Sequence, residues 1–170
     1  PTLRKLKILF GLMYKYAVIH EIIPKERNLV EYLDIKKAGN PNAYNREPFS
    51  KTEVAKLWDV KDSNIYYTVI LMLIYTGCRI GELLDLKKGN VNLEERYFKI
   101  VASKTAAGIR TAPISEKVYP FFEYWYNLND CEYLLSTPEG EHFKYRNYYD
   151  SYWSPLIETL GMKHRPHDTR

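Results

Sequence analysis

The chain has 170 residues, of which 45% are hydrophobic and 27% are charged, and its formal net charge is +4. This length suffices for one ordinary domain, or for one domain with part of another, and the composition excludes a mainly disordered chain. The two cysteines, Cys78 and Cys131, make neither a disulfide framework nor a paired-cysteine zinc site, and they fit a reducing cytoplasm. We expect no secretory signal, and the longest apolar run, residues 69–75, is too short to span a membrane.

The positive charge is distributed unevenly along the chain. Residues 1–40 hold 8 Lys/Arg and 4 Asp/Glu, whereas residues 41–170 hold 17 of each. Binding of a polyanion by the larger part would therefore depend on where its charges are placed, because it has no excess of them. The chain also contains 16 tyrosines, whose ordinary role is packing in cores and interfaces.

The first 48 residues predict a helix and a linker. Residues 3–20 predict an amphipathic helix, because their apolar residues recur at a spacing of three to four. Pro24 ends this helix or follows its end. Residues 36–48 contain one glycine and two prolines and show no apolar period, so we place a domain boundary there.

The next segment predicts three helices. Ser50 and Glu53 have the spacing of a capping box, which predicts a helix that begins after Ser50. Residues 64–76 are apolar on nearly all sides, so we expect a central buried helix that Gly77 stops. A short helix should follow over residues 79–86.

The second half of the chain mixes strands and helices. Two short β runs, residues 97–102 and 109–114, flank residues 104–108 and predict a hairpin. The other expected elements are a strand and turn at 88–93, a helix at 115–128, a third short strand or loop edge at 134–136, and a helix at 145–160 that Pro155 kinks or breaks. Together they predict a mostly helical α+β domain with a small antiparallel sheet at one edge.

Arg79 is the first residue that suggests chemistry. It opens a helix directly after the most buried segment, where the helix dipole disfavours a cation. The position suits Arg79 if an anion binds there, because the backbone N–H groups and the guanidinium then both point at it. Glu82 lies one turn further and can hold Arg79 in position. Taken alone, the two residues also fit a simple surface ion pair.

Two further groups of basic residues are candidates. Lys104 lies at the tip of the predicted hairpin, where an ordinary solvated charge is the alternative. Residues 163–170, KHRPHDTR, contain five basic or imidazole side chains, and His167 and Arg170 share a face if the segment is helical. A metal site at His164 and His167 lacks the carboxylate or cysteine ligands that would complete it, so we expect neither a metal nor a cofactor. A basic terminal tail is the alternative.

The order of these motifs resembles the catalytic domain of tyrosine recombinases. TGCRIGELLDL is followed by SKT on the predicted hairpin and then by HDTR, as in the integrases of phages and of integrative conjugative elements. Under this resemblance, residues 49–170 are most of the catalytic domain and residues 36–48 are the interdomain linker. Residues 1–35 are then the last helices of a core-binding domain.

The resemblance implies DNA cleavage without a metal, through a covalent 3′-phosphotyrosyl intermediate. Arg79 and Arg170 would clamp the scissile phosphate, whose extra charge in the pentacoordinate state needs a permanent cationic partner. Lys104 would protonate the departing 5′ oxygen as general acid. His167 would hydrogen-bond the phosphate and assist proton transfer, and Glu82 would orient Arg79.

The chain departs from the family pattern in two places. Gly81 stands where many relatives have serine. No tyrosine follows Arg170, so none occupies the family's nucleophile position, and Tyr148, Tyr149 and Tyr152 come too early. We therefore expect a fragment of an integrase that binds DNA and a phosphate but does not cleave by itself.

The resemblance also implies the partners. These are double-stranded DNA attachment sites in the bacterial cytoplasm, with no membrane, a homotetramer on DNA for the full-length enzyme, and a monomer for this fragment. Two alternatives stay open: a non-catalytic DNA-binding regulator derived from a recombinase domain, and a relative of type IB topoisomerases or telomere resolvases. The four cationic site residues argue against the regulator, which would need base-reading helices more than a phosphate clamp.

Overall fold

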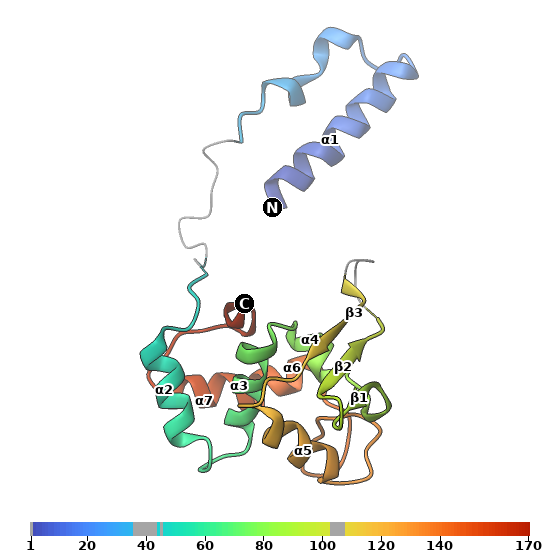
Figure 1. The fold of residues 1–170 in the computed structure, drawn as a ribbon. Coiled ribbons are helices and arrows are strands. Elements are labelled where there is room, and N and C mark those ends of the chain that lie inside the picture. The colour runs from blue at the N-terminus through green and yellow to red at the C-terminus, as the bar shows by residue number, and fades with distance from the viewer. Residues whose placement is uncertain (1, 36–43, 45, 103–107) are drawn as a thin grey trace. The chain divides into compact units, whose positions relative to one another are not determined.

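The computed structural model describes residues 2–35, 44, 46–102 and 108–170 (Figure 1). The chain divides into two units, Pro1–Asn45 and Arg46–Arg170. None of the helices in the described ranges is long and apolar enough to cross a membrane.

The first unit is built around one long helix. This helix, α1, spans Thr2–Ile19, in agreement with the prediction for residues 3–20. It packs on the second of two short 3-10 turns, η1 (Lys25–Arg27) and η2 (Leu29–Tyr32). Within this unit the predicted apolar stripe stays exposed, as Phe10 and Met13 illustrate.

The second unit begins with helix α2, Lys51–Val60, and its start confirms the predicted capping box. Glu53 N donates to the Ser50 hydroxyl at 3.3 Å, and Ser50 N donates to Glu53 Oε2 at 2.8 Å. These two bonds satisfy donors that a helix start otherwise leaves without partners. The helix buries Leu57 in the core of the unit.

Helix α3, Tyr66–Thr76, lies at the centre of the second unit, as its apolar sequence predicts. Every residue from Tyr66 to Leu73 is buried. The elements that pack on it are α2, α5 (Tyr119–Asn127) and η6 (Pro166–Thr169). The helix ends at Gly77, whose φ of +60° is a left-handed conformation that glycine adopts without a steric penalty.

The strands of the described residues form one antiparallel sheet in the order β1 (Val91–Asn92), β2 (Tyr97–Ile100) and β3 (Arg110–Pro113). The predicted hairpin is confirmed, because β2 pairs with β3 and places Phe98 opposite Ala112. Both of these residues are buried, as one face of a two-residue period requires. The predicted tip, with Lys104, lies outside the described residues. The 3-10 turn η3 (Lys88–Asn90) leads into β1, where a strand and turn were predicted.

The predicted helix at 145–160 consists of three consecutive segments, α6 (Tyr145–Tyr148), the π-helical turn η5 (Tyr149–Trp153) and α7 (Ser154–Thr159). Pro155 lies in the first turn of α7. Proline has no N–H to donate one turn back and its ring crowds the carbonyl there, so the helix widens just before it. The kink or break predicted at Pro155 thus takes the form of a π-helical turn.

One predicted segment near the sheet differs in detail, and another follows one of its two predicted alternatives. The helix expected at 115–128 begins only at Tyr119, because residues 115–118 first form a turn closed by a bond from Val118 N to Ser115 O at 3.0 Å. The segment 134–136 is a loop edge, with one isolated bridge between Ser136 and His142.

Replacing a leucine of α3 should destabilise the second unit. Leu71→Ala should lower the free energy of unfolding by about 2–5 kcal/mol, because Leu71 is fully buried and a cavity would remain. Leu128→Ala is the matched control: it removes the same atoms from a residue that is 43% exposed, and should cost less than about 1 kcal/mol. Urea denaturation followed by tryptophan fluorescence measures both variants. Equal losses would contradict a central position for α3.

Candidate functional site

Arg79 lies where the chain leaves α3 and enters α4, Ile80–Leu84. Glu82 accepts two hydrogen bonds from it, one from the backbone N at 2.9 Å and one from Nη1 at 2.6 Å. The expected contact between the two residues is therefore present. Because the backbone N–H of Arg79 donates to the Glu82 carboxylate, it closes the capping box and is not available to a bound anion.

A second arginine, which the sequence pattern did not identify, shares the same carboxylate. Arg110 Nη2 donates to Glu82 Oε2 at 3.0 Å, and Arg110 Nη1 donates to Gly108 O at 2.9 Å. Glu82 thereby joins α4 to the first residue of β3. The only sequence signal for Arg110 was a basic residue where the return strand of the hairpin begins.

These contacts keep Glu82 ionised. Burial alone would raise the pKa of Glu82, but hydrogen bonds from Arg110 and Arg79 outweigh it and lower the pKa to about 2. At neutral pH, two guanidiniums therefore face one carboxylate, and a positive charge is left over. Glu82 is 5% exposed whereas Arg79 is 39% exposed. Among the described residues, no partner contacts the other nitrogens of the Arg79 guanidinium, which remain available to a ligand.

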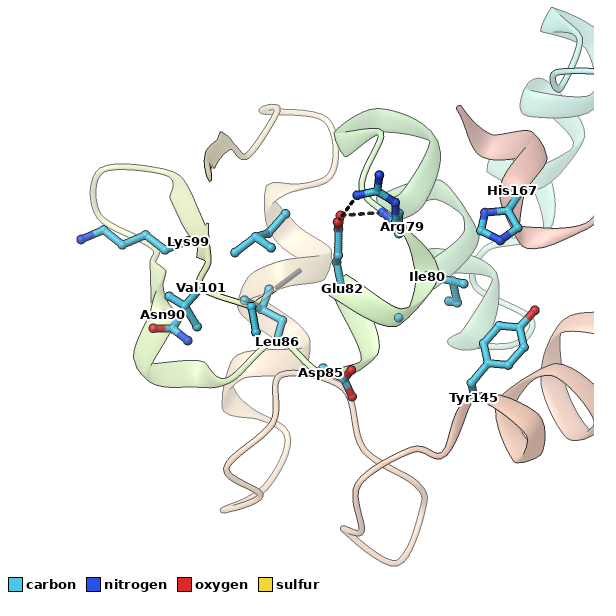
Figure 2. A pocket seen from close by; sticks show the side chains of 13 residues that line it. Arg79, Ile80, Glu82, Asp85, Leu86, Asn90, Lys99, Val101, Tyr145 and His167 are labelled. Carbon is cyan, nitrogen blue, oxygen red and sulfur yellow. Dashed lines mark hydrogen bonds and ion pairs between the residues drawn. The ribbon is translucent and has the colours of Figure 1, made fainter. Parts of the chain in front are cut away.

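Arg79 and Glu82 line a pocket of about 390 Å³, and so does His167 of η6, far away in the sequence. In Figure 2, the guanidinium of Arg79 lies between the carboxylate of Glu82 and the ring of His167. The pocket thus brings together three of the five predicted site residues. Asp85 and Lys99 add further charged groups to its wall.

The two remaining predicted site residues are Arg170 and Lys104. Arg170 directly follows η6, the turn that carries His167, and its side chain is exposed. Among the described residues that line the pocket, Arg170 does not appear, so its convergence with Arg79 stays a prediction. Lys104 lies outside the described residues.

His164 is part of the core rather than of an exposed basic tail. Its Nε2 lies 3.1 Å from Glu53 Oε1, and its ring stacks on Phe49 with ring centroids 4.0 Å apart. Trp153 Nε1 donates to His164 O at 2.9 Å. These contacts hold the terminal segment against the start of α2 and so fix the backbone that leads to His167. The described residues contain no cluster of three or more His, Cys, Asp and Glu side chains suited to a metal ion.

The nucleophilic side chains near the pocket are protonated at neutral pH. Burial raises the pKa of the Cys78 thiol, next to Arg79, to about 11. Burial also raises the pKa of Tyr148, which is fully buried. Tyr145 is the tyrosine that lines the pocket among the described residues, and Figure 2 shows its hydroxyl directed toward His167. Burial raises the pKa of Tyr145 as well.

A sequence model of the phage integrase family matches residues 49–170, which include the whole pocket. The chain belongs to the phage integrase family. The resemblance to tyrosine recombinases that the motifs predicted is therefore confirmed. No curated protein matches the chain.

Solved structures of integrases and recombinases share the fold. The Tn1549 transposon integrase in complex with circular intermediate DNA superposes with a TM-score of 0.78 at 17% identity, over 99% of this chain and 63% of that chain. The XerA recombinase superposes with a TM-score of 0.63 at 18% identity, over 96% of this chain and 65% of that chain. A lambda integrase dimer bound to a COC′ core site superposes with a TM-score of 0.71 at 16% identity, over 96% of this chain and 48% of that chain.

These superpositions confirm the predicted fold class, a mostly helical α+β catalytic domain with a small antiparallel sheet. The chain spans less than two thirds of the length of each of these three solved chains. At identities below 20% the superpositions show the fold alone, so the roles of individual site residues stay predictions.

The ionised Glu82 should make the stability of this integrase domain depend on pH. Its pKa falls from an ordinary 4.5 to about 2 in the folded chain, so the carboxylate stabilises the fold above about pH 4.5 and loses this contribution as the pH falls toward 2. Glu82→Gln should therefore reduce the free energy of unfolding at pH 6 by on the order of 2–3 kcal/mol, and by clearly less at pH 3. Urea denaturation at the two pH values measures this difference.

Glu132→Gln is the control, because Glu132 pairs with Lys87 at 2.8 Å but is 65% exposed. The difference in unfolding free energy between this variant and the unmodified chain should hardly change between pH 6 and pH 3. If the loss of unfolding free energy shrank equally between pH 6 and pH 3 for both variants, the Glu82 carboxylate would have no special environment.

Proposed function

We propose that the chain is the part of a site-specific tyrosine recombinase that binds the scissile phosphate of double-stranded DNA. The protein would integrate or excise a mobile element by cleaving and rejoining strands at attachment sites. The observation that carries this proposal is the pocket in which Arg79 and His167 meet, in a chain of the phage integrase family. The Tn1549 and lambda integrases that share its fold were solved with DNA.

Arg79 is suited to a phosphate because its guanidinium is permanently charged and the N–H groups that Glu82 does not engage form a planar fork. The negative charge on the non-bridging oxygens grows in the pentacoordinate state, so a cation fixed beforehand lowers the barrier. His167, on the other side of Arg79, can donate to the same phosphate or pass a proton. In this proposal Arg170 is the second arginine of the clamp and Lys104 is the general acid, as the family resemblance implies.

The nucleophile in this proposal is none of the tyrosines of the chain. Tyr148 belongs to the core, and Tyr145, although it lines the pocket, precedes His167 in the sequence. We further propose that residues 1–35 belong to a core-binding domain joined by a linker at 36–48. The full-length enzyme would act as a homotetramer on DNA in the bacterial cytoplasm, whereas this chain alone would be monomeric.

Duplex DNA should bind this chain with an affinity that falls steeply as salt increases. Each phosphate that a basic side chain neutralises contributes a slope of about −0.9 to the plot of log affinity against log salt. Arg79→Ala should weaken binding by only about three- to tenfold, since many contacts share the interaction. Fluorescence anisotropy with a labelled duplex, at salt from about 50 to 200 mM, measures both effects. An affinity independent of salt, or no binding at low salt, would exclude DNA as the ligand.

Covalent cleavage should separate an enzyme from a DNA-binding regulator. The 170-residue chain should give no protein–DNA adduct on a suicide duplex nicked beside the cleavage position of the attachment site. The full-length protein should give the adduct, and Arg79→Ala or Arg170→Ala should abolish it, because each removes one of the two arginines that clamp the phosphate in the transition state. A denaturing gel shows the adduct as a shifted band.

Two results would change the proposal. An adduct from the 170-residue chain would mean that an internal tyrosine is the nucleophile, with Tyr145 the first to examine by peptide mapping and Tyr145→Phe. A full-length protein that binds the site tightly but never forms an adduct would favour the regulator.

A further inference from the structure

The Glu82 carboxylate is held from two sides by elements that are distant in sequence. Arg79 contacts it from the start of α4, and Arg110 contacts it from β3, 28 residues away. Both carboxylate oxygens are used: Oε1 accepts from Arg79 Nη1 at 2.6 Å and lies 3.4 Å from Arg110 Nη1, while Oε2 accepts from Arg110 Nη2 at 3.0 Å. The carboxylate is therefore shared, and neither arginine neutralises it alone.

The contact between Arg79 and Glu82 would not fix Arg79 by itself. Arg79 is the N-cap of the five-residue helix α4 and Glu82 lies three positions further, so this contact ties Arg79 only to its own helical turn. Arg79 N also donates to Glu82 Oε2 at 2.9 Å, but this single backbone bond to one oxygen still lets the carboxylate turn together with the Arg79 guanidinium. A fixed direction for Arg79 requires that Glu82 itself be held from outside the helix.

Arg110 provides that second support. Its guanidinium is anchored at two points, because Nη1 donates to Gly108 O at 2.9 Å while Nη2 binds Glu82. Gly108 is buried, and Arg110 pairs with Ile100 in the sheet, so the support is tied to the β-sheet. The planar fork of arginine can reach a carbonyl and a carboxylate at once, which the single ammonium of lysine does less well.

We propose that Arg110 is a positioning residue for Arg79: it holds the Glu82 carboxylate in place from the sheet, so that Arg79 presents its remaining N–H donors to the pocket in one fixed direction. The consequence for DNA rests on the proposed function of this pocket. The positioning itself does not depend on DNA and can be measured without it.

The first experiment measures the order of the Arg79 side chain in the 170-residue chain without DNA. In a sample with ¹⁵N-labelled arginine, the Nε–H signal of Arg79 is assigned by its absence in Arg79→Ala. Its ¹H–¹⁵N NOE should be high in the unmodified chain, fall by at least half in Arg110→Gln, and lie between the two in Arg110→Lys. Arg96→Gln is the matched control, because it removes an exposed arginine of the same sheet region that stacks on Tyr119 and does not contact Glu82.

The second experiment is a double-mutant cycle on DNA affinity with Arg79→Ala and Arg110→Gln. If Arg110 acts through Arg79, Arg110→Gln should weaken binding no more than Arg79→Ala does, and the double variant should match Arg79→Ala within about twofold. Arg110 is itself 31% exposed, so additive losses would make it a direct DNA contact and would overturn the proposal. Arg110→Lys keeps the charge and should recover part of the affinity. Thermal unfolding of each variant identifies any chain that no longer folds.

The two experiments separate the inference from the proposed function. An Arg79 side chain that stays ordered in Arg110→Gln overturns the positioning role, whatever the DNA affinity. An Arg79 side chain that loses order in Arg110→Gln, while Arg79→Ala leaves DNA affinity unchanged, supports the positioning role and overturns the phosphate-binding function of Arg79.

Discussion

The burial of α3 from Tyr66 to Leu73 is the constraint on which the rest of the second unit depends. Its residues from Tyr66 to Leu73 are apolar on every side apart from Thr68, whose hydroxyl donates to Ile65 O at 2.5 Å and accepts from Trp125 Nε1 at 3.1 Å. Such a helix is stable in water only when other elements cover it completely. The surrounding helices α2 and α5 and the turn η6 supply much of that cover, and Phe143 and Tyr152 pack on Tyr66.

The same constraint determines where the site forms. Gly77 ends α3 at the edge of the core, so Cys78 is still buried while Arg79 already reaches solvent. Because η6 also packs on α3, His167 arrives at the pocket next to Arg79 from the other end of the chain. One buried helix thus fixes the backbone that carries both residues. They reach the same pocket although they are far apart in the sequence.

The site obtains a positive charge by placement, in a part of the chain that has no excess of it. Residues 41–170 hold equal numbers of basic and acidic side chains. Arg79 and Arg110, however, share the Glu82 carboxylate, and their hydrogen bonds keep its pKa near 2. The surplus positive charge is local and partly shielded from water. A charge in such a place acts more strongly than one at an open surface. Net charge therefore says little about anion binding by this domain.

Apart from the site residues, which the order of the motifs implied, the features that the sequence predicted depend on short stretches of the chain. The capping box at Ser50, the stop at Gly77 and the hairpin pairing all depend on neighbours in the chain. The features it missed are contacts between distant segments, such as Arg110 with Glu82, 28 residues apart, and His164 with Glu53, 111 residues apart. No regular sequence spacing predicts either contact, because only the packing of the whole domain brings the two residues of each pair together.

The terminal segment shows how tertiary contacts change the meaning of a basic sequence. In isolation KHRPHDTR fits a solvated tail, yet Pro166, Asp168 and Thr169 are buried, and Asp168 Oδ2 accepts from Arg165 N at 2.6 Å. The segment folds as a 3-10 turn, whose repeat of three residues directs side chains three positions apart to the same side. His167 lines the pocket and is three positions before Arg170, and both are exposed. The turn ends at Thr169, so it holds His167 but not Arg170. Its buried residues Pro166 and Asp168 lie on either side of His167 in the chain and leave this residue exposed at the pocket.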